Sequence, residues 1–405
     1  MINAAQAREI IVQSIVPSPV EECSLTQCEG RVLASDIVAP HDVPLFDNSS
    51  MDGFAVRVKD IQSSSRETPA LLKLSSEIPA GRSASEEVRP GSAMRIMTGA
   101  PVPAGADAVV EQEMAETKNG MVGVVGPVTP GRNIRRKGED IKEGTTVLKA
   151  GRALTPARVG VLASLGIQMV RVCKKPRVAL LVTGNELVEV EKNPGPGQIR
   201  NSNGFTLEGL IRQSGGEPVN LGIVPDTPAD LAARLRMGLV HDAVVTSGGI
   251  SVGKYDLVLE TLKSEGVEIR FWKVNIKPGM PMAFGIWNSK KRAGVPVFAL
   301  PGNPVSSMVT FRQFVRPGLE KLAGLEPVEP LRVKAVLGEN IRKDDGKRHF
   351  VRGIARNGTN GIIVITTGSQ SSGVLTSMAT ANCLIILPED ARGMKQGDSV
   401  EIELL

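Results

Sequence analysis

The stretch "AVVTSGGISVGKYDLVLETL" (residues 243–262) decides the fold, because in it a buried strand passes into a helix through a glycine-rich loop. The apolar run Ala243–Val245 predicts the strand, and the apolar pattern that begins at Leu257 predicts the helix. Three glycines and two serines lie between them. Glycine lets a backbone come close to a ligand, and a helix N-terminus attracts anions. The loop therefore predicts an anion-binding site.

Strands and helices alternate on both sides of this loop, which is typical of a parallel sheet covered by helices on both faces. The predicted strands are Arg177–Val182, Val219–Val224, Ala243–Val245, Val267–Phe271 and Val295–Leu300. The predicted helices are Gly204–Gln213, Pro228–Val240 with Thr227 as its N-cap, a helix from Leu257, and Pro304–Val315. We predict a central α/β domain with a mostly parallel sheet over residues 174–322.

The segments that flank residues 174–322 are rich in glycine, proline and short β-like runs. Residues 1–40 and 131–173 are predicted to form an N-terminal elongated domain, into which a β-rich domain of residues 41–130 is inserted. After Pro330 five β-like runs follow without a predicted helix between them: Arg332–Leu337, Arg348–Ile354, Gly361–Thr366, Asn382–Leu387 and Ser399–Leu404. They predict a small β-barrel over residues 327–405, and the chain as a whole is predicted to be an α/β multidomain protein.

Composition excludes several classes of protein. The chain has 405 residues, of which 3% are aromatic, and a formal net charge of +5. So few aromatic side chains disfavour a surface that stacks nucleic-acid bases, and so small a charge requires neither nucleic acid nor a membrane. Four scattered cysteines favour free thiols in a reducing compartment, and no apolar run has the length of a membrane span. We expect a cytoplasmic protein.

Three loops follow strands of the predicted sheet and should meet at one edge, where α/β proteins bind their ligands. They are Thr183–Glu186, Thr246–Gly253 and Pro301–Pro304. The second loop does not match the P-loop pattern, since Lys254 is followed by Tyr255. We expect an alanine at Gly248 or Gly249 to obstruct a bound phosphate while the fold is retained.

Charged side chains near these loops are candidates for binding metals and anions. Glu186, Asp226 and Asp256 follow strands, and carboxylates in such positions can hold Mg²⁺. Asp226 and Asp256 have the alternative role of helix N-caps. Lys273 and Lys277 stand four residues apart in a predicted strand, so both should point to one face. The two lysines either hold an anion or belong to a solvated surface.

Seven motifs then occur along the chain in a characteristic order. They are "PLFDNSSMDGFAVR" (44–57), "RIMTGAPVPAGADAVVEQE" (95–113), "GRNIRRKGEDIKEG" (131–144), "TGNEL" (183–187), "SGGISVGKYD" (247–256), "KVNIKPGMPMAFG" (273–285) and "ALPGNPVSS" (299–307). Together they cover nearly the whole chain. In this combination the chain resembles the molybdopterin molybdenumtransferases, the MoeA-like family that includes the gephyrin E domain.

The resemblance implies a reaction and its partners. Adenylated molybdopterin, made by a molybdopterin adenylyltransferase, binds the α/β domain, molybdate or tungstate is inserted into its dithiolene, and AMP is released. The implied cofactor is Mg²⁺, and the implied clients are molybdoenzymes. The implied assembly is a homodimer whose site joins the α/β domain of one chain to the N-terminal domain of its partner.

The resemblance also implies roles for individual residues. The implied catalytic residues are Asp140, Glu186, Lys273 and Lys277. The implied substrate-binding residues are Asp52, Thr98, Thr183, Gly184, Asp226, Ser247, Gly248, Gly249, Ser251, Gly253, Pro301, Gly302, Asn303, Pro304, Ser306 and Ser372. The implied metal ligands are Glu186 and Asp256. A cation at Lys347 or Arg348 is expected to join Ser372 at the site.

Two positions depart from the family pattern, and two other functions stay open. Met280 stands where many members have a lysine, and Asn185 replaces a common aspartate. One alternative is a nucleotidyl or phosphate transferase of the related molybdopterin adenylyltransferase type. Such enzymes carry a Gly-Thr-Gly type of loop where this chain has Gly249-Ile250-Ser251. The other is a non-catalytic scaffold, which would be expected to lose the carboxylates and lysines that this chain retains.

Overall fold

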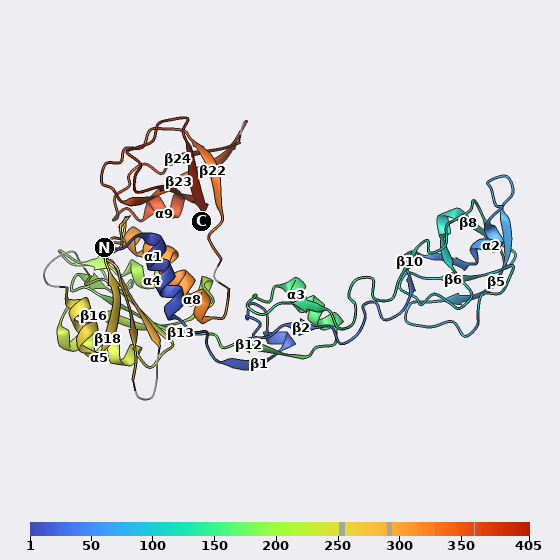
Figure 1. Ribbon diagram of the computed structural model, residues 1–405, viewed down its shortest axis with the longest axis horizontal. Helices are drawn as coiled ribbons and strands as arrows, with labels where there is room; N and C mark the ends of the chain where they lie inside the picture. The colour runs from blue at the N-terminus through green and yellow to red at the C-terminus, as the bar shows by residue number, and fades with distance from the viewer. Residues whose placement is uncertain (251–255, 290–293, 327, 360) are drawn as a thin grey trace. The chain divides into compact units, whose positions relative to one another are not determined.

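The computed structural model describes residues 1–405 except 251–255, 290–293, 327 and 360. The chain folds into two units (Figure 1). The first unit contains residues 1–35, 151–155 and 169–405, and the second contains residues 36–150 and 156–168. The first unit holds a central sheet and a C-terminal barrel, and the second holds a separate β-rich core.

A six-stranded sheet forms the centre of the first unit. Its strands, in order across the sheet, are β16 (Glu217–Val224), β13 (Arg177–Thr183), β17 (Ala243–Ser247), β21 (Val295–Leu300), β20 (Ala283–Trp287) and β18 (Val267–Trp272). The first four strands are parallel, and each of the last two runs antiparallel to its neighbour. The predicted α/β domain is confirmed. Strand β20 was not among the predicted strands, and it makes the sheet mixed.

Helices cover both faces of this sheet. They are α1 (Ala4–Ser14), α4 (Ser202–Gln213), α5 (Pro228–Gly238), α6 (Leu257–Ser264), α7 (Pro304–Thr310) and α8 (Arg316–Leu322). Thr227 and Asp256 accept hydrogen bonds at the N-termini of α5 and α6, as their sequence positions indicated. Figure 1 shows α1, α4 and α8 close together, and all three contribute to one apolar core.

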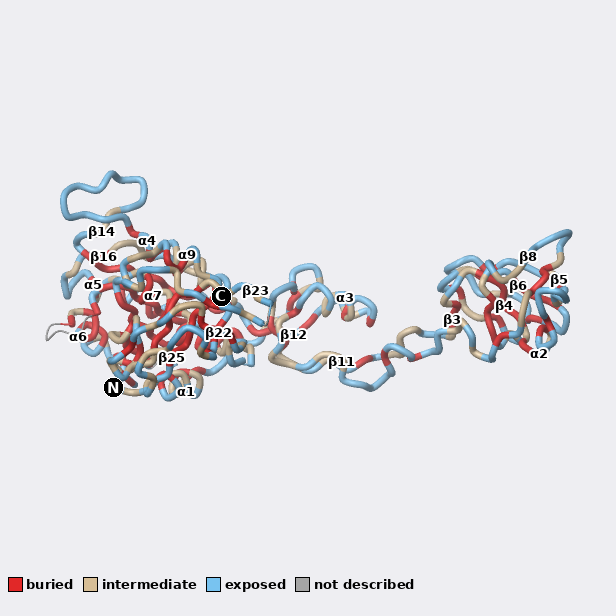
Figure 2. The backbone as a smooth tube through the Cα atoms, turned by 90° about the horizontal axis from the view of Figure 1, so that it is seen from above, coloured by how far each residue is buried: buried red, intermediate tan, exposed pale blue. Residues whose placement is uncertain are grey.

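The strands supply two apolar cores because successive side chains point to opposite faces of a sheet. In β13, Leu180 packs in the core under α1, α4, α7 and α8, whereas Leu181 packs in the core under α5 and α6. In β21, Phe298 and Ala299 divide in the same way. Figure 2 shows these buried residues in red. The continuous apolar runs of the sequence are therefore strands that are buried on both faces.

The helix predicted over Pro304–Val315 continues to Leu322 through one π-helical turn, η3 (Phe311–Val315). Pro317 lies just after this turn and has no N–H to donate to a carbonyl four residues earlier. The Arg316 N–H donates to the Phe311 carbonyl, five residues back. The wider turn lets the helix pass the proline without ending.

The C-terminal residues form a closed barrel. Its strands are β22 (Arg332–Leu337), β23 (Arg348–Gly358), β24 (Gly361–Thr366), β25 (Cys383–Leu387) and β26 (Ser399–Leu404). They pair in the ring β23-β24-β22-β26-β25, and β25 returns to β23. The predicted barrel is confirmed, but the expectation of no helix between its strands is wrong. Helix α9 (Thr376–Thr380) is a single short segment, too brief for an apolar period to reveal it.

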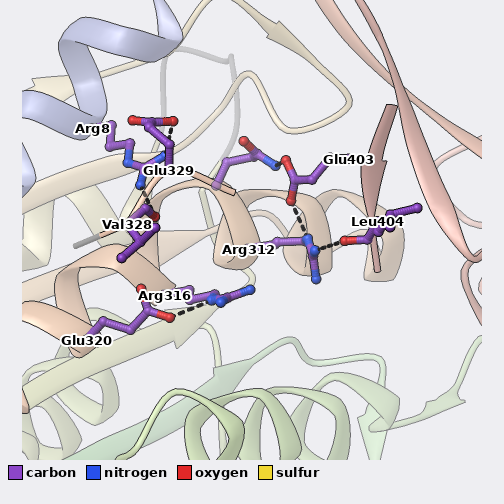
Figure 3. Close-up of polar contacts among 9 residues, drawn as sticks. Arg8, Arg312, Arg316, Glu320, Val328, Glu329, Glu403 and Leu404 are labelled. Atoms are coloured by element: carbon purple, nitrogen blue, oxygen red, sulfur yellow. Dashed lines mark hydrogen bonds and ion pairs between the residues drawn. The ribbon is translucent and has the colours of Figure 1, made fainter. Parts of the chain in front are cut away.

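The contacts that join the barrel to the α/β part of the first unit include a strand pairing and an ion pair. Strand β19 (Ile276–Lys277) leaves the α/β segment and pairs in parallel with β23. At the second contact the Arg312 guanidinium donates to Glu403 and to the Leu404 carbonyl (Figure 3). The Glu403 side chain is fully buried and also accepts a hydrogen bond of 2.9 Å from Gln313. A buried carboxylate is thus neutralised by a cation from the helical run.

The remaining elements of the first unit are short. They are β1 (Val20–Ser24), which pairs with β12 (Met169–Cys173), the 3₁₀ turn η1 (Leu25–Gln27), and the pair β14 (Leu187–Val188) and β15 (Ile199–Arg200). Residues 189–198, between β14 and β15, are exposed (pale blue in Figure 2). Among the described helices, none is both long enough and apolar enough to cross a membrane.

The second unit is β-rich, as predicted. Its sheet has the order β7 (Ala108–Glu111), β4 (Gly53–Val56), β6 (Ser92–Ile96), β5 (Ala70–Ile78), β9 (Met121–Val124) and β8 (Ala115–Lys118). Its other elements are β2 (Ile37–Val38), β3 (Asn48–Ser49), β10 (Ile134–Arg135), β11 (Thr146–Leu148), α2 (Val58–Ile61), η2 (Gln112–Met114) and α3 (Pro156–Ser164). The side chains of Phe54, Val110 and Val122 are among those that form its core.

The two arginines of the helical run provide a test of the barrel contact. Arg312→Met should lower the free energy of unfolding by about 3 kcal/mol, because it leaves the buried Glu403 carboxylate without its charged partner. The matched control is Arg316→Met, since Arg316 pairs with Glu320 at the surface of α8 (Figure 3). The control should change that free energy by less than about 0.5 kcal/mol. Urea denaturation measures both, and equal effects would contradict the importance of the buried pair.

Candidate active site at the strand ends of the central sheet

A cavity of about 820 Å³ opens where β13, β17 and β21 end. Parallel strands bring their carboxyl ends to one edge, so the three predicted loops meet there. The predicted residues that line the cavity are Thr183, Gly184, Glu186, Asp226, Ser247, Gly248, Gly249, Gly302, Asn303 and Pro304. The lining residues that the sequence did not indicate are Val182, Leu187, Ile199, Arg200, Asn201, Ser202, Asn203, Ile250, Leu257, Gly373 and Leu375.

Asp226 ties the end of β16 to the first loop. Its carboxylate accepts hydrogen bonds from the Thr183 hydroxyl at 2.5 Å and from the Asn185 N–H at 3.3 Å. The Asp226 N–H in turn donates to the Asn185 side-chain oxygen at 3.1 Å. Thr227, not Asp226, caps α5, so the N-cap alternative for Asp226 is wrong. Asn185 and Asp226 thus exchange two hydrogen bonds, and the amide at position 185 does so without placing a second carboxylate beside Asp226.

Asn203 connects the other two loops. Its side-chain amide donates to the Ser247 hydroxyl at 2.9 Å and to the Gly302 carbonyl at 2.8 Å. The Ser247 hydroxyl also lies 3.2 Å from the Pro301 carbonyl, so Pro301 contributes its backbone behind the cavity wall. Asn203 lies in the first turn of α4, which Asn201 caps. The polar run at residues 201–203, placed after a strand and before a helix, was the signal that could have indicated it.

The glycines of the second loop are required by the protein's own packing. A Cβ on Gly248 would lie 2.1 Å from the Thr183 carbonyl oxygen, and a Cβ on Gly249 would lie 2.5 Å from the Val258 side chain. Both residues have positive φ, at +98° and +63°. The expectation that alanine here would affect only a bound phosphate is therefore wrong. By contrast, the nearest atom to a Cβ on Gly302 is the Gly248 Cα, at an ordinary 3.5 Å.

Two carboxylates and one guanidinium lie among the described lining residues: Glu186, Asp226 and Arg200. Within the described residues Glu186 makes no side-chain hydrogen bond, so its carboxylate is available to a ligand. No group of three or more His, Cys, Asp or Glu side chains within the described ranges could hold a metal ion by itself.

Asp256 caps α6 next to the cavity. Its carboxylate accepts from the Leu259 N–H at 3.1 Å, and the residue is 4% exposed. Its N-cap role is confirmed, and its role as a metal ligand stays a prediction. Ser251 and Gly253, which complete the same loop in the sequence, lie outside the described residues.

Lys273 and Lys277 do not share a strand face, contrary to the sequence-based expectation. Strand β18 ends at Trp272, and Lys273 has a φ of +71° with its ammonium 3.9 Å from the centre of the Trp272 ring. Lys277 lies in β19, which pairs with the barrel. Left-handed backbone at Lys273 breaks the strand, so the two lysines do not belong to one strand.

The Lys277 ammonium lies 3.1 Å from the Asp345 carboxylate, whose other oxygen lies 2.7 Å from His349 Nε2. Burial alone would raise the pKa of the Asp345 carboxyl. The hydrogen bonds with Lys277 and His349 outweigh it and hold that pKa well below its usual range. Burial lowers the pKa of His349 although Asp345 opposes this. Lys277 thus faces a permanently charged carboxylate from the barrel.

The barrel reaches the cavity through the loop before α9. Gly373 and Leu375 line the cavity, and the Ser372 carbonyl accepts a hydrogen bond of 3.1 Å from the Val305 N–H in α7. Ser306 is buried in the same helix, away from the described lining. Neither Lys347 nor Arg348 is among the described residues that line the cavity, and Arg348 pairs with Glu389 at 3.2 Å. The expected cation beside Ser372 stays a prediction.

The second unit holds the remaining predicted residues. Asp52 accepts hydrogen bonds from the Thr98 N–H and hydroxyl, each at 2.7 Å, so these two predicted residues meet. The bond from the Thr98 backbone, followed by the one from its hydroxyl, lowers the pKa of the Asp52 carboxyl. Asp140 is exposed, and its N–H donates to the Val43 carbonyl at 3.1 Å.

Alanine scanning of the glycines should separate packing from binding. Gly249→Ala should cost at least about 2 kcal/mol of stability, because it combines a left-handed backbone with a steric clash. Gly302→Ala should change stability by less than about 0.5 kcal/mol, because its Cβ meets no close neighbour. Thermal and urea denaturation check both values. A stable Gly249→Ala protein would show that the packing argument is wrong, and Gly302 is the glycine at which ligand binding can be tested.

Three family models match consecutive parts of the chain. The MoeA N-terminal region (domain I and II) matches residues 2–166, and a probable molybdopterin binding domain matches residues 179–321. The MoeA C-terminal region (domain IV) matches residues 334–405. The cavity therefore lies mostly within the segment that matches the probable molybdopterin binding domain, and Gly373 and Leu375 come from the C-terminal region.

Relatives match over the full length of the chain. It is 40% identical to molybdopterin molybdenumtransferase 2 of Mycobacterium tuberculosis over 93% of both chains. It is 38% identical to the molybdopterin molybdenumtransferase of Haemophilus influenzae over 100% of this chain and 98% of that protein. The crystal structure of a molybdopterin biosynthesis MoeA protein from Pyrococcus horikoshii superposes with a TM-score of 0.84 at 33% identity, over 100% of both chains. The chain therefore belongs to the MoeA family of molybdopterin molybdenumtransferases.

Proposed function

We propose that this chain inserts molybdate, or tungstate, into adenylated molybdopterin and releases AMP in molybdenum cofactor biosynthesis. The observation that carries the proposal is the cavity at the ends of β13, β17 and β21, in the segment that matches a molybdopterin binding domain. Its volume of about 820 Å³ lies within the range of cavities that hold organic ligands of this size.

The walls of the cavity suit a ligand that carries phosphate. Backbone from three loops approaches closely because Gly248 and Gly302 have no side chains. Hydroxyl and amide groups of Ser247 and Asn203 fix the loops to one another. Arg200 supplies a guanidinium, whose planar donors fit phosphate oxygens. These groups support recognition of the phosphate end of a pterin nucleotide.

The same walls support a role for Mg²⁺ as cofactor. Two carboxylates and one guanidinium lie among the described lining residues, so a phosphate alone would meet a net negative charge from this part of the lining. Mg²⁺ binds through one or two carboxylates together with phosphate oxygens, and would neutralise charge on the phosphate that leaves with AMP. Glu186 fits this role because its carboxylate has no protein partner among the described residues.

Lys277 is the residue that we assign to the oxoanion. Its side chain is 58% exposed and its ammonium is a compact charge, so a tetrahedral dianion can approach it. Asp345 keeps this ammonium on the barrel side of the Lys273–Lys277 segment. Lys273, whose ammonium lies over the Trp272 ring, is the second cation of the segment. Met280, which stands where many family members have a lysine, adds no further positive charge to this segment.

An adenylyl-transferring activity is the second candidate. It would use the same cavity, but would form the bond between AMP and molybdopterin rather than break it. The sequence Gly249-Ile250-Ser251 in place of a Gly-Thr-Gly type of loop favours insertion of the metal. Molybdate-dependent release of AMP from adenylated molybdopterin separates the two, because adenylyl transfer needs no molybdate. A scaffold without activity would release no AMP under either condition.

We further propose the setting of this reaction. A molybdopterin adenylyltransferase supplies the adenylated substrate in the cytoplasm, and molybdoenzymes receive the product. The active protein is a homodimer in which the α/β domain of one chain works with Asp52, Thr98 and Asp140 of the other. The charged, exposed position of Asp140 in the second unit supports a role outside the core of its own unit.

Lys277→Met tests the oxoanion assignment. Stability should change by less than about 0.5 kcal/mol, because the lysine is exposed and His349 remains beside Asp345. The molybdate concentration for half-maximal AMP release should rise at least about tenfold, because a charge-assisted contact is lost. Lys277→Arg should raise this molybdate concentration less than Lys277→Met does, because the charge is kept while a planar guanidinium replaces a compact ammonium.

The control for Lys277 is Lys149→Met, which removes another exposed lysine paired with an aspartate, Asp36, at 2.8 Å. It should leave the molybdate dependence unchanged. If the molybdate titrations of wild type, Lys277→Met and Lys149→Met superimpose, Lys277 does not bind the oxoanion and belongs to the solvated surface.

Mixing two inactive variants tests the shared site. Asp140→Ala and Glu186→Ala chains should each release little AMP. After mixing under conditions that exchange subunits, the mixture should recover up to about a quarter of wild-type activity, because about half of its dimers are hybrids and one of the two sites in each hybrid is intact. Differently tagged chains verify that hybrids form. If tagged hybrids form and stay inactive, both residues act in sites of a single chain.

A further inference from the structure

The barrel places an aspartate–histidine pair beside Lys277, the residue that the proposed function assigns to the oxoanion. Asp345 lies in the loop before β23, and one of its carboxylate oxygens lies 3.1 Å from the Lys277 ammonium. Its other oxygen lies 2.7 Å from His349 Nε2 and accepts a hydrogen bond of 3.3 Å from the Lys347 N–H. The ammonium therefore already has a counter-ion, with which an incoming anion must compete.

The exposure of the three side chains indicates which of them can move. Lys277 is 58% exposed and has a flexible four-carbon stem, whereas the side chains of Asp345 and His349 are 22% and 10% exposed. The loop that carries Asp345 is also held from the α/β side, because the Asn275 side chain donates to the Gly346 carbonyl at 3.0 Å. The ammonium can therefore leave Asp345 while the carboxylate keeps its bond with His349.

The charges around His349 set its protonation state. The charged groups of the described residues that act on it most strongly are Asp345, Lys277 in β19 and Lys343 in the loop after β22. Its register partner in the neighbouring strand β25 is Leu387, which carries no charge. Burial lowers the pKa of His349, Asp345 opposes this, and the two ammonium groups lower that pKa further. His349 is therefore neutral at neutral pH and becomes charged as the pH falls.

We propose that Asp345 is an internal counter-ion, which the oxoanion displaces from Lys277, and that His349 retains the carboxylate when this happens. The inference rests on the proposed function, since it concerns how tightly the assigned lysine binds molybdate or tungstate. Asp345 is thus a positioning residue that limits the affinity for the anion, because it holds the ammonium but repels a dianion. Protonation of His349 strengthens binding, because an imidazolium neutralises Asp345 and leaves the lysine charge to the anion.

Asp345→Asn tests the counter-ion role, because it removes the negative charge and keeps the shape of the side chain. The molybdate concentration for half-maximal AMP release should fall at least about threefold, because the anion no longer competes with a carboxylate. The matched control is Asp36→Asn, since Asp36 is the counter-ion of Lys149 at 2.8 Å, and it should leave this concentration unchanged. A rise or no change in Asp345→Asn would overturn the proposal, because a merely structural residue gives no gain in affinity.

His349→Gln tests the pH dependence, because glutamine keeps a donor for Asp345 but takes up no proton. In the wild type the half-maximal molybdate concentration should fall about threefold as the pH is lowered from about 8 to about 5, the range in which histidines titrate. His349→Gln should lose this fall. The control His241→Gln, which changes a histidine between α5 and β17, should keep it. The same pH dependence in wild type and His349→Gln would contradict the role of His349.

NMR titration of the His349 ring gives a readout that does not depend on activity. The chain has three histidines, and the signal that is missing in His349→Gln identifies this one. Molybdate added to the wild-type protein should raise the pKa of His349 by about 0.5, which by linkage corresponds to the threefold higher affinity of the protonated protein. Sodium chloride at the same ionic strength should raise it less.

The NMR titration also separates this inference from the proposed function. If the wild-type protein releases no AMP, the proposed function fails, and the response of His349 to molybdate still decides whether the oxoanion reaches the pair. If molybdate and sodium chloride affect the pKa of His349 equally, the oxoanion does not displace Asp345 and the inference is wrong.

Discussion

The close approach of Gly248 to the Thr183 carbonyl is the contact on which the cavity depends. A Cβ at this position would lie 2.1 Å from that carbonyl oxygen, so the first two loops pack backbone against backbone. The third loop joins them, since the Gly248 Cα is the nearest atom to a Cβ built on Gly302. A parallel sheet brings three strand ends together, but only glycine lets their loops converge without filling the space. The cavity is therefore a consequence of missing side chains.

The sequence predicted what depends on local pattern. Buried strands appeared as apolar runs, and Thr227 and Asp256 appeared as caps, because these signals arise within a few residues. Strand β20 was not predicted, because the run at 283–287 contains a glycine and follows a segment rich in proline and methionine. The separation of Lys273 and Lys277 from any one strand was not predicted for another reason. It follows from a left-handed residue and from pairing with a strand of the distant barrel, which no local period encodes.

About half of the described residues that line the cavity could be predicted from the sequence, for a similar reason. Residues in the loops after strands were found because fold topology brings strand ends together. Asn203, Gly373 and Leu375 were not found, because they enter from a helix and from the barrel. Arg352, a buried residue of β23, was the hardest residue of the barrel to infer. An arginine in the middle of a barrel strand has no sequence feature that distinguishes burial from exposure, and its partners are carbonyl groups rather than an acid.

Arg312, which is half-buried, and Arg352, which is buried, meet the electrostatic cost of burial in different ways. Arg312 faces Glu403, so that pair is neutral and contributes to holding the barrel. Among the described residues Arg352 donates to neutral oxygens and pairs with no carboxylate. An uncompensated charge acts at longer range in a poorly polarisable interior than it would in water. Arg200 is the guanidinium among the described residues that line the cavity, and it favours an anion there. Glu186 and Asp226 on the opposing loops favour a cation. A ligand that carries both a metal ion and a phosphate can interact favourably with both kinds of charged group, which a neutral molecule cannot do.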